Sequence, residues 1–120
     1  MLERLDETQW RIVRVRAEGA LIPTVDDGDG TEFTFLGDGR FAGSTGCNRF
    51  FGKFTVREDG SLDTGPVGVT MMMCPDDRMI QERRVLDALE ATAAVVEAGD
   101  AVELQDSAGA TVLDLANPEL

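Results

Sequence analysis

GCNRFFG at residues 46–52 and TMMMCP at residues 70–75 are the two stretches that decide the fold of this chain. They hold both of its cysteines, Cys47 and Cys74, and no other part of the sequence is as unusual. The second stretch leads directly into a helical pattern, whereas the first lies among short segments that are typical of strands. The two stretches therefore say more about architecture than about a reaction.

The composition predicts a single folded domain over residues 1–120. A chain of 120 residues with 42% hydrophobic residues can bury a core without a metal ion or a crosslink. The formal net charge of −12 repels phosphate groups, so we expect no nucleic-acid binding. No apolar stretch is long enough for a membrane span, so we also expect no membrane insertion. The charge favours either a cationic partner or simple solubility.

The chain contains neither His nor Tyr. Without His there is no Ser-His-Asp triad, no Cys-His dyad and no imidazole ligand for a metal ion. We therefore expect a protein that is not an enzyme, with no catalytic residue, no cofactor and no metal site.

Short segments between Gly, Asp and Asn residues predict antiparallel strands joined by tight turns. Phe33 and Phe35 alternate with polar residues, so they share one face of their strand. The expected strands are residues 10–15, 31–35, 40–44, 54–57 and 61–63, followed after the helix by residues 94–98, 102–105 and 111–115.

Residues 75–91 contain no Gly and no Pro beyond Pro75, which suits the first helical position. Asp76 and Asp77 favour the positive end of the helix dipole. The expected apolar stripe is Met79, Val85, Leu86 and Leu89, and the expected polar face is Arg78, Glu82, Arg83 and Asp87. This order of elements predicts an α+β fold, in which one amphipathic helix packs on a curved antiparallel sheet of about seven to eight strands.

Several features occur together in a fixed order. They are an early Trp, a Phe-rich hairpin, GCNRFFG, a Gly-Pro pair, TMMMCP, a Glu in the helix and an aliphatic last strand. From about Thr8 to Leu115 the chain resembles the META domain family, the HslJ-like heat-shock proteins. The resemblance implies a partly open β-barrel with one helix and no established catalytic activity. It also implies a bacterial protein, since members are often exported or lipid-anchored in the envelope and some are linked to heat shock or antibiotic tolerance.

Residues 1–7 are charged and show no targeting pattern, and no lipid-attachment cysteine lies near the start. We expect a cytoplasmic protein if Met1 is the natural start. A periplasmic or envelope location is expected if the chain was trimmed from a longer protein.

Cys47 and Cys74 have two interpretations. The resemblance implies that their segments lie near each other, which would allow a disulfide or a redox-active thiol pair. Alternatively, both are buried thiols that act as small apolar residues. A catalytic thiol is disfavoured because no His is present to activate it.

The first cysteine segment carries further candidate residues of the structural motif, which begins at Gly46 and ends at Gly52. Asn48 follows a Gly and a Cys, so we expect it in a turn, where Asn tolerates a left-handed backbone. Arg49 is expected to pair with Glu82 of the helix and so to brace the strand against it. Binding of an anionic ligand by Arg49 is the alternative.

Other clusters favour structural roles. We expect Phe50, Phe51 and Phe54 in the core. Three consecutive Met side chains at residues 71–73 cannot all face one way in a strand, so at least one is expected to pack inward and a shared copper site is disfavoured. Residues 26–30 (DDGDG) lack the ligand spacing of a calcium loop and predict a solvated turn.

We therefore predict a monomeric, non-enzymatic module that binds an unknown protein, a peptide or a small apolar ligand in a stress or envelope context. A thiol-based redox or stress sensor that uses Cys47 and Cys74 is the alternative. A hydrolase built on carboxylates is a third and weaker hypothesis.

Overall fold

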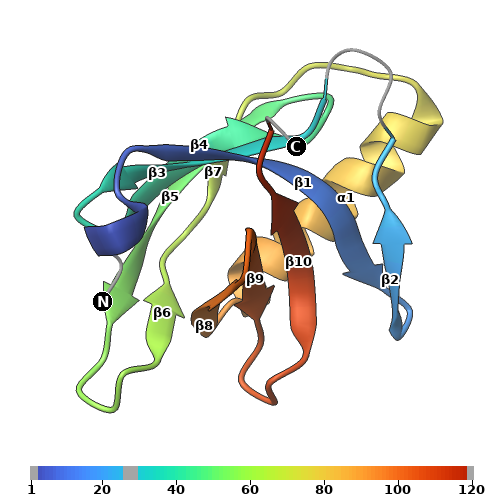
Figure 1. Cartoon of the computed structure of the whole chain (residues 1–120). Helices are drawn as coiled ribbons and strands as arrows, with labels where there is room; N and C mark the ends of the chain where they lie inside the picture. The colour runs from blue at the N-terminus through green and yellow to red at the C-terminus, as the bar shows by residue number, and fades with distance from the viewer. Residues whose placement is uncertain (1–2, 26–29, 119–120) are drawn as a thin grey trace.

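The computed structural model describes residues 3–25 and 30–118 of the chain. Within those residues, ten strands, one α-helix and one short 3₁₀ helix follow one another (Figure 1). In chain order they are η1 (Glu3–Leu5), β1 (Thr8–Ala17), β2 (Ala20–Pro23), β3 (Glu32–Gly37), β4 (Arg40–Ser44), β5 (Arg49–Val56), β6 (Leu62–Thr64), β7 (Gly68–Val69), α1 (Asp76–Ala91), β8 (Ala94–Ala98), β9 (Ala101–Gln105) and β10 (Thr111–Ala116).

The strands form one antiparallel sheet with two halves that meet at β1. Eight strands make a continuous path in the order β6-β5-β4-β3-β1-β10-β9-β8, while β2 pairs with β1 and β7 pairs with β5. Residues 8–11 of β1 pair with β3, and residues 11–15 of the same strand pair with β10. One long strand therefore belongs to both halves, which bends the sheet around the core.

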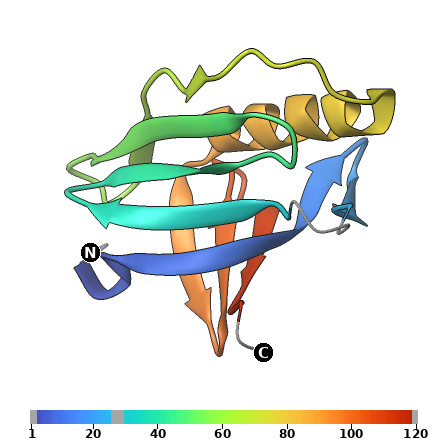
Figure 2. The same ribbon diagram turned by 90° about the horizontal axis from the view of Figure 1, so that it is seen from above.

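The sheet stays open between β6 and β8, which do not pair with each other. The loop before β8 nevertheless bonds to β6: the Leu62 amide donates to the Ala93 carbonyl at 2.8 Å, and the Thr64 hydroxyl donates to the Thr92 carbonyl at 2.9 Å. The helix α1 packs against β1, β10 and β6, and Figure 2 shows it alongside the sheet. The predicted α+β class is confirmed. The main path has the expected number of strands, and β2 and β7 are two short additions.

Most predicted strands lie where the residue pattern placed them. The largest difference is β5, which begins at Arg49 instead of residue 54. It starts earlier because it pairs with β4 back to Ser44 and with β7 at Phe50 and Phe51. The pairing with β4 is a hairpin and the pairing with β7 joins residues about 20 positions apart, and neither partner strand is visible in the pattern of residues 49–53 alone.

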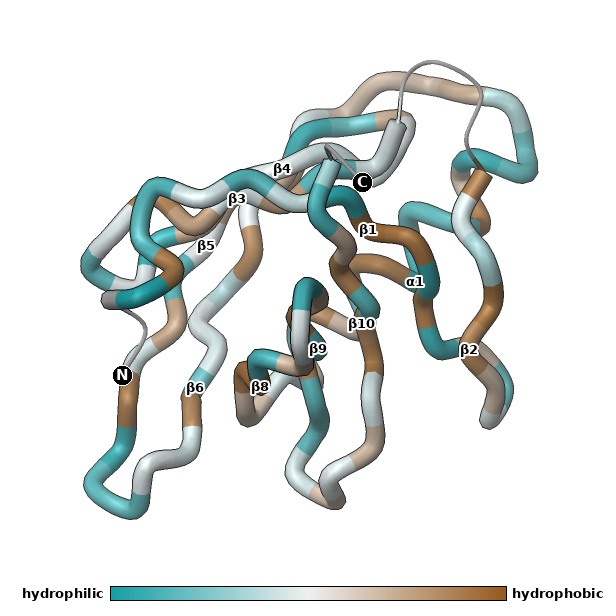
Figure 3. The backbone as a smooth tube through the Cα atoms, viewed as in Figure 1, coloured by the Kyte–Doolittle hydropathy of each residue, from teal (hydrophilic) through white to brown (hydrophobic). Residues whose placement is uncertain are grey.

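The core is centred on five phenylalanines that are almost completely buried: Phe33, Phe35, Phe41, Phe50 and Phe54. The rings of Phe41 and Phe54 have centroids 4.5 Å apart, and Phe33 lies 4.8 Å from Phe35. Hydrophobic stretches of β1, β10 and α1 meet beside this cluster (Figure 3). The core assignment is confirmed for Phe50 and Phe54. It is wrong for Phe51, which is 55% exposed because alternate residues of β5 face opposite sides of the sheet.

The helix α1 begins at Asp76, with Pro75 one position earlier as the N-cap residue. The sequence predicted Pro75 at the first helical position, and the structure places it one residue before that position. Its carbonyl accepts hydrogen bonds from the Arg78 and Met79 amides, which start the helix. The buried residues of the helix are Gln81, Glu82, Val85, Ala88 and Leu89. The prediction that Glu82 lies on the polar, solvent-facing side is therefore wrong.

Two glycines of the β4–β5 pair make room for aromatic rings. Gly43 pairs with Phe50, and Gly52 pairs with Phe41. A Cβ atom added to Gly52 would lie 2.6 Å from Cζ of Phe41. Gly52 is thus needed because the Phe41 ring occupies the space above it.

Gly43 is the tighter of these two positions. A Cβ atom there would lie 2.1 Å from the carbonyl oxygen of Glu32 and 2.5 Å from Cζ of Phe50. A backbone oxygen held in a sheet cannot move aside as a flexible side chain can. Gly43→Ala is therefore expected to lower the free energy of unfolding by about 2 kcal/mol, measured by urea denaturation.

Gly65 provides the matched control for this substitution. A Cβ atom at Gly65 would meet only the Lys53 carbonyl oxygen, at an ordinary contact distance of 3.8 Å. Gly65→Ala should leave the midpoint of unfolding almost unchanged. Equal midpoints for the two variants would contradict the close packing at Gly43.

Candidate functional site

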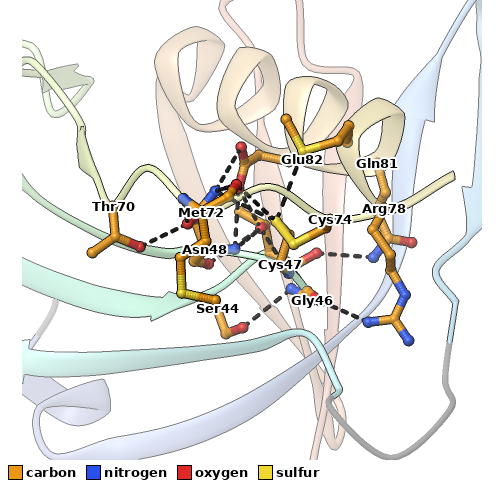
Figure 4. The surroundings of a disulfide bond; sticks show 12 residues. Ser44, Gly46, Cys47, Asn48, Thr70, Met72, Cys74, Arg78, Gln81 and Glu82 are labelled. Atoms are coloured by element: carbon orange, nitrogen blue, oxygen red, sulfur yellow. Dashed lines mark hydrogen bonds between the residues drawn. A yellow bond between two sulfur atoms is a disulfide. The ribbon is translucent and has the colours of Figure 1, made fainter. Parts of the chain in front are cut away.

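The two cysteine-bearing segments meet in front of the N-terminal part of α1. A disulfide joins Cys47 and Cys74, whose Cα atoms are 5.9 Å apart (Figure 4). The chain has no free cysteine. Of the two interpretations of the cysteines, the bonded pair is the one found, and the pair of free buried thiols is not. The bond fixes the loop that precedes the helix to the β4–β5 turn.

The β4–β5 turn is shaped by Gly46. Its φ of +90° lies in the left-handed region that favours glycine. An added Cβ atom would also lie 2.9 Å from Nε2 of Gln81. The turn closes with a hydrogen bond from the Thr45 amide to the Asn48 carbonyl at 2.9 Å. The left-handed residue that the sequence assigned to Asn48 is therefore Gly46.

Asn48 instead holds the loop that carries the methionines. Its Oδ1 accepts hydrogen bonds from the Met72 amide at 2.6 Å and the Thr70 hydroxyl at 3.0 Å. Its Nδ2 donates to the Met72 carbonyl at 3.2 Å. One buried side chain thus satisfies both backbone groups of Met72, as a neighbouring strand would.

The hydrogen bonds from Asn48 to Thr70 and Met72 form a clamp on the loop. Glu82 is buried below this clamp and accepts hydrogen bonds from Asn48 and Thr45. Its Oε1 receives the Thr45 hydroxyl at 2.8 Å and the Asn48 amide at 3.2 Å. Its Oε2 receives Nδ2 of Asn48 at 3.2 Å. Because the side chain is only 8% exposed, these donors take the place of water around the carboxylate.

The predicted pair between Arg49 and Glu82 is wrong. Arg49 forms an ion pair with Glu32 at 3.4 Å, and its side chain is 64% exposed. The reason is the alternation of side chains from the end of the β4–β5 turn into β5, which turns Asn48 and Phe50 inward and Arg49 outward. The brace between sheet and helix exists, but Asn48 and Thr45 make it with Glu82.

Two further helix residues bond to the same turn. Nε2 of Gln81 donates to the Thr45 carbonyl at 2.9 Å, and Arg78 donates to the Gly46 carbonyl at 2.6 Å. Sequence reasoning missed Gln81 and treated Arg78 as solvent-facing. The available signal was the spacing of residues 78, 81 and 82, which places all three on one face of a helix.

The three methionines of the loop all face solvent. Met71 and Met73 are each 90% exposed, and Met72 is 60% exposed. The prediction that at least one packs inward is wrong, since this stretch is a loop without the alternation of a strand. The loop passes over the disulfide, and a mixed-charge cleft of about 780 Å³ opens beside it. Residues at its wall include Glu32, Arg49, Cys47 and Asp77.

The described residues show no group of three or more His, Cys, Asp or Glu that could hold a metal ion. The turn predicted at residues 26–30 falls largely outside the described residues. Within residues 3–25 and 30–118, no helix combines the length and the apolar character that a membrane crossing needs. The reactive groups that the described residues bring together at this site are the disulfide and the exposed thioethers of residues 71–73.

Solved structures with this fold include three that align with nearly the whole chain. A protein from Burkholderia xenovorans, solved by NMR, has 24% sequence identity and a TM-score of 0.71, covering 95% of this chain and 83% of its own. A second NMR structure has 21% identity and a TM-score of 0.72, with 97% and 93% of the two chains covered. A DUF4847 family protein from Bacteroides vulgatus has 14% identity and a TM-score of 0.65, with 99% and 98% covered.

These structures share the fold with the present chain, and their sequences are too distant to carry a function. None of the curated proteins matches the sequence. The model of the META domain family, in contrast, matches residues 3–119. That span contains the disulfide, the clamp at Asn48 and the buried Glu82. By this match over nearly its whole length, the chain belongs to the META domain family.

Proposed function

We propose that this META domain is a non-enzymatic binding module, which uses its methionine loop, residues 71–73, to hold a cationic, apolar segment of a partner polypeptide. The observation that carries this proposal is the exposure of all three thioether side chains. Exposed apolar groups next to one another in a soluble protein often mark an interaction site. The stress or envelope setting of this role rests on the family resemblance.

The backbone of the loop is held in place although its side chains are free. Asn48 bonds the amide and the carbonyl of Met72, and the disulfide fixes Cys74 two residues later. A fixed backbone reduces the ordering cost of binding. Met side chains are unbranched and adaptable, so they can fit apolar partners of different shape.

The charge of the chain favours a cationic partner. With a formal net charge of −12, the surface attracts basic segments over long distances and repels acidic ones. The methionine loop offers apolar contacts, and the negative surface of the chain attracts basic groups. We therefore expect a partner segment in which basic and apolar residues alternate.

A labelled peptide of alternating Lys and Leu residues provides the probe. Fluorescence anisotropy should show binding of this peptide, and replacement of Met71, Met72 and Met73 by Gln should weaken it by about tenfold or more. Gln keeps the length of the side chain and removes its apolar character. The matched control replaces Leu36, Val56 and Val96, which are exposed elsewhere on the sheet, by polar residues.

The control variant should bind the peptide as the wild type does. A peptide of alternating Glu and Leu should not bind. Absence of binding by the basic peptide, or equal weakening in both variants, would contradict a methionine-loop site.

The disulfide favours a second candidate function, a thiol-based redox or stress sensor that uses Cys47 and Cys74. Both residues are only partly buried, so a reducing agent can reach the bond. Opening it would release the loop from the β4–β5 turn, except for the bonds made by Asn48. Alkylation and mass spectrometry in glutathione buffers spanning about −180 to −320 mV test this role. A sensor requires a midpoint inside that range, and a bond that stays closed throughout it would exclude the role.

A further inference from the structure

Three sulfur atoms lie together where the helix meets the methionine loop. Sγ of Cys47 is bonded to Sγ of Cys74 and lies 3.8 Å from Sδ of Met79. Met79 is a partly buried residue in the first turn of α1, in contrast to the fully exposed Met71 and Met73. Cys74 and Met79 lie close together in the sequence, at the start of α1, and the fold brings Cys47 of the β4–β5 turn to them.

We propose that reduction of the disulfide turns this cluster into a binding site for Cu(I). The two thiolates of Cys47 and Cys74 and the thioether of Met79 would be its ligands. Thiolate and thioether sulfurs are soft ligands that select Cu(I) over hard cations such as Mg²⁺ and Ca²⁺. Zn²⁺ fits less well, because it prefers four ligands from Cys, His and carboxylates, and the chain has no His.

The spacing between the sulfurs of Cys47 and Met79 suits a three-coordinate ion. An ion bound about 2.3 Å from each of three sulfurs in a plane places those sulfurs about 4 Å apart. The distance from Cys47 to Met79 is already close to this value. Once the bond is broken, rotation about the Cα–Cβ bonds can separate the two cysteine sulfurs, since their Cα atoms are 5.9 Å apart.

The surroundings keep the ligands together when the disulfide is open. Asn48 still bonds the Met72 backbone, and Glu82 still accepts hydrogen bonds from Asn48 and Thr45. These bonds connect the two cysteine segments and the helix independently of the sulfurs.

Reduction of the disulfide needs only a phosphine and water. A phosphine supplies two electrons, two protons come from solvent, and the disulfide becomes two thiols. The phosphine takes an oxygen atom from water and leaves as its oxide. Binding of Cu(I) by both thiols then releases two protons, and Met79 adds a neutral ligand.

A competition titration tests the site. The protein is reduced with a phosphine, freed of reductant under anaerobic conditions and titrated with Cu(I) in the presence of bicinchoninate, a coloured Cu(I) chelator. The reduced wild type should remove one equivalent of Cu(I) from the chelator, and the oxidised wild type should remove none. Met79→Leu keeps the size and apolar character of the side chain and should weaken binding by about tenfold or more.

Met71→Leu is the matched control, because Met71 lies on the nearby loop and is 90% exposed. It should bind Cu(I) as the wild type does. Circular dichroism of the reduced proteins shows whether the fold persists. The proposal is overturned by a reduced wild type that leaves Cu(I) with the chelator or has lost its fold, or by Met79→Leu binding as the wild type does.

Discussion

Glu82→Ala is expected to lower the free energy of unfolding by about 3 kcal/mol. The substitution removes the acceptor of three hydrogen bonds, those from the Asn48 amide, its Nδ2 and the Thr45 hydroxyl, and leaves these buried donors with weaker or shared acceptors only. Buried donors that lose their acceptor carry the full cost of desolvation. Urea denaturation followed by circular dichroism measures the effect.

Glu82→Gln should cost less than Glu82→Ala, because the amide keeps one oxygen that can accept from Thr45 and the Asn48 backbone. Its NH₂ group would face Nδ2 of Asn48, so two donors would oppose each other. Glu90, which is exposed on the same helix, is the matched control. Glu90→Ala should change the free energy of unfolding by less than about 0.5 kcal/mol. The same small change at Glu82 would refute its role as the acceptor that joins helix and sheet.

Loss of the disulfide is expected to have an effect of similar size. Replacing Cys47 and Cys74 by Ala should lower the free energy of unfolding by about 3 kcal/mol. The bond joins residues 27 positions apart and so restricts a long loop in the unfolded chain. Guanidinium denaturation of the wild type and the double variant, without reductant, measures the difference.

Addition of a phosphine reductant separates the effect of the disulfide on stability from the effect of the two substitutions. It should lower the stability of the wild type towards that of the double variant and leave the double variant unchanged. Mass spectrometry after alkylation must show two modified thiols in the reduced wild type. A reduced wild type as stable as the oxidised protein would show that the loop is held by the Asn48 and Glu82 bonds alone.

Local patterns were sufficient to place most elements of the fold. The β4 and β8 strands lie at the residues expected for them, and the helix differs from its expected start by one residue. These elements have strong local signals: alternating or β-branched strands between turn residues, and a long stretch without Gly. The strand β7 was missed because it has two residues and pairs with β5, about 20 residues earlier in the chain. The strand β2 forms a tight hairpin with β1 and was missed because its four residues do not alternate clearly between apolar and polar.

The candidate site was predicted in part. The proximity of Cys47 and Cys74 followed from the family resemblance, and the structure joins them. The partner of Glu82 could not be predicted, because Arg49 and Asn48 are neighbours and only the register of β5 decides which of them points towards the helix. A shift of one residue in that register would have exchanged their roles.

By itself the sequence determined the fold class, the position of the helix α1, the family and the absence of imidazole chemistry, because these depend on composition, local periodicity and the order of motifs. Only the tertiary structure decided that Glu82 is buried, that the methionines of residues 71–73 are exposed and that Met79 lies beside the disulfide. The physical reason is that burial and contact depend on strand register and on the packing of segments far apart in the chain. A side chain's chemical type restricts its possible roles, and its neighbours in space select among them.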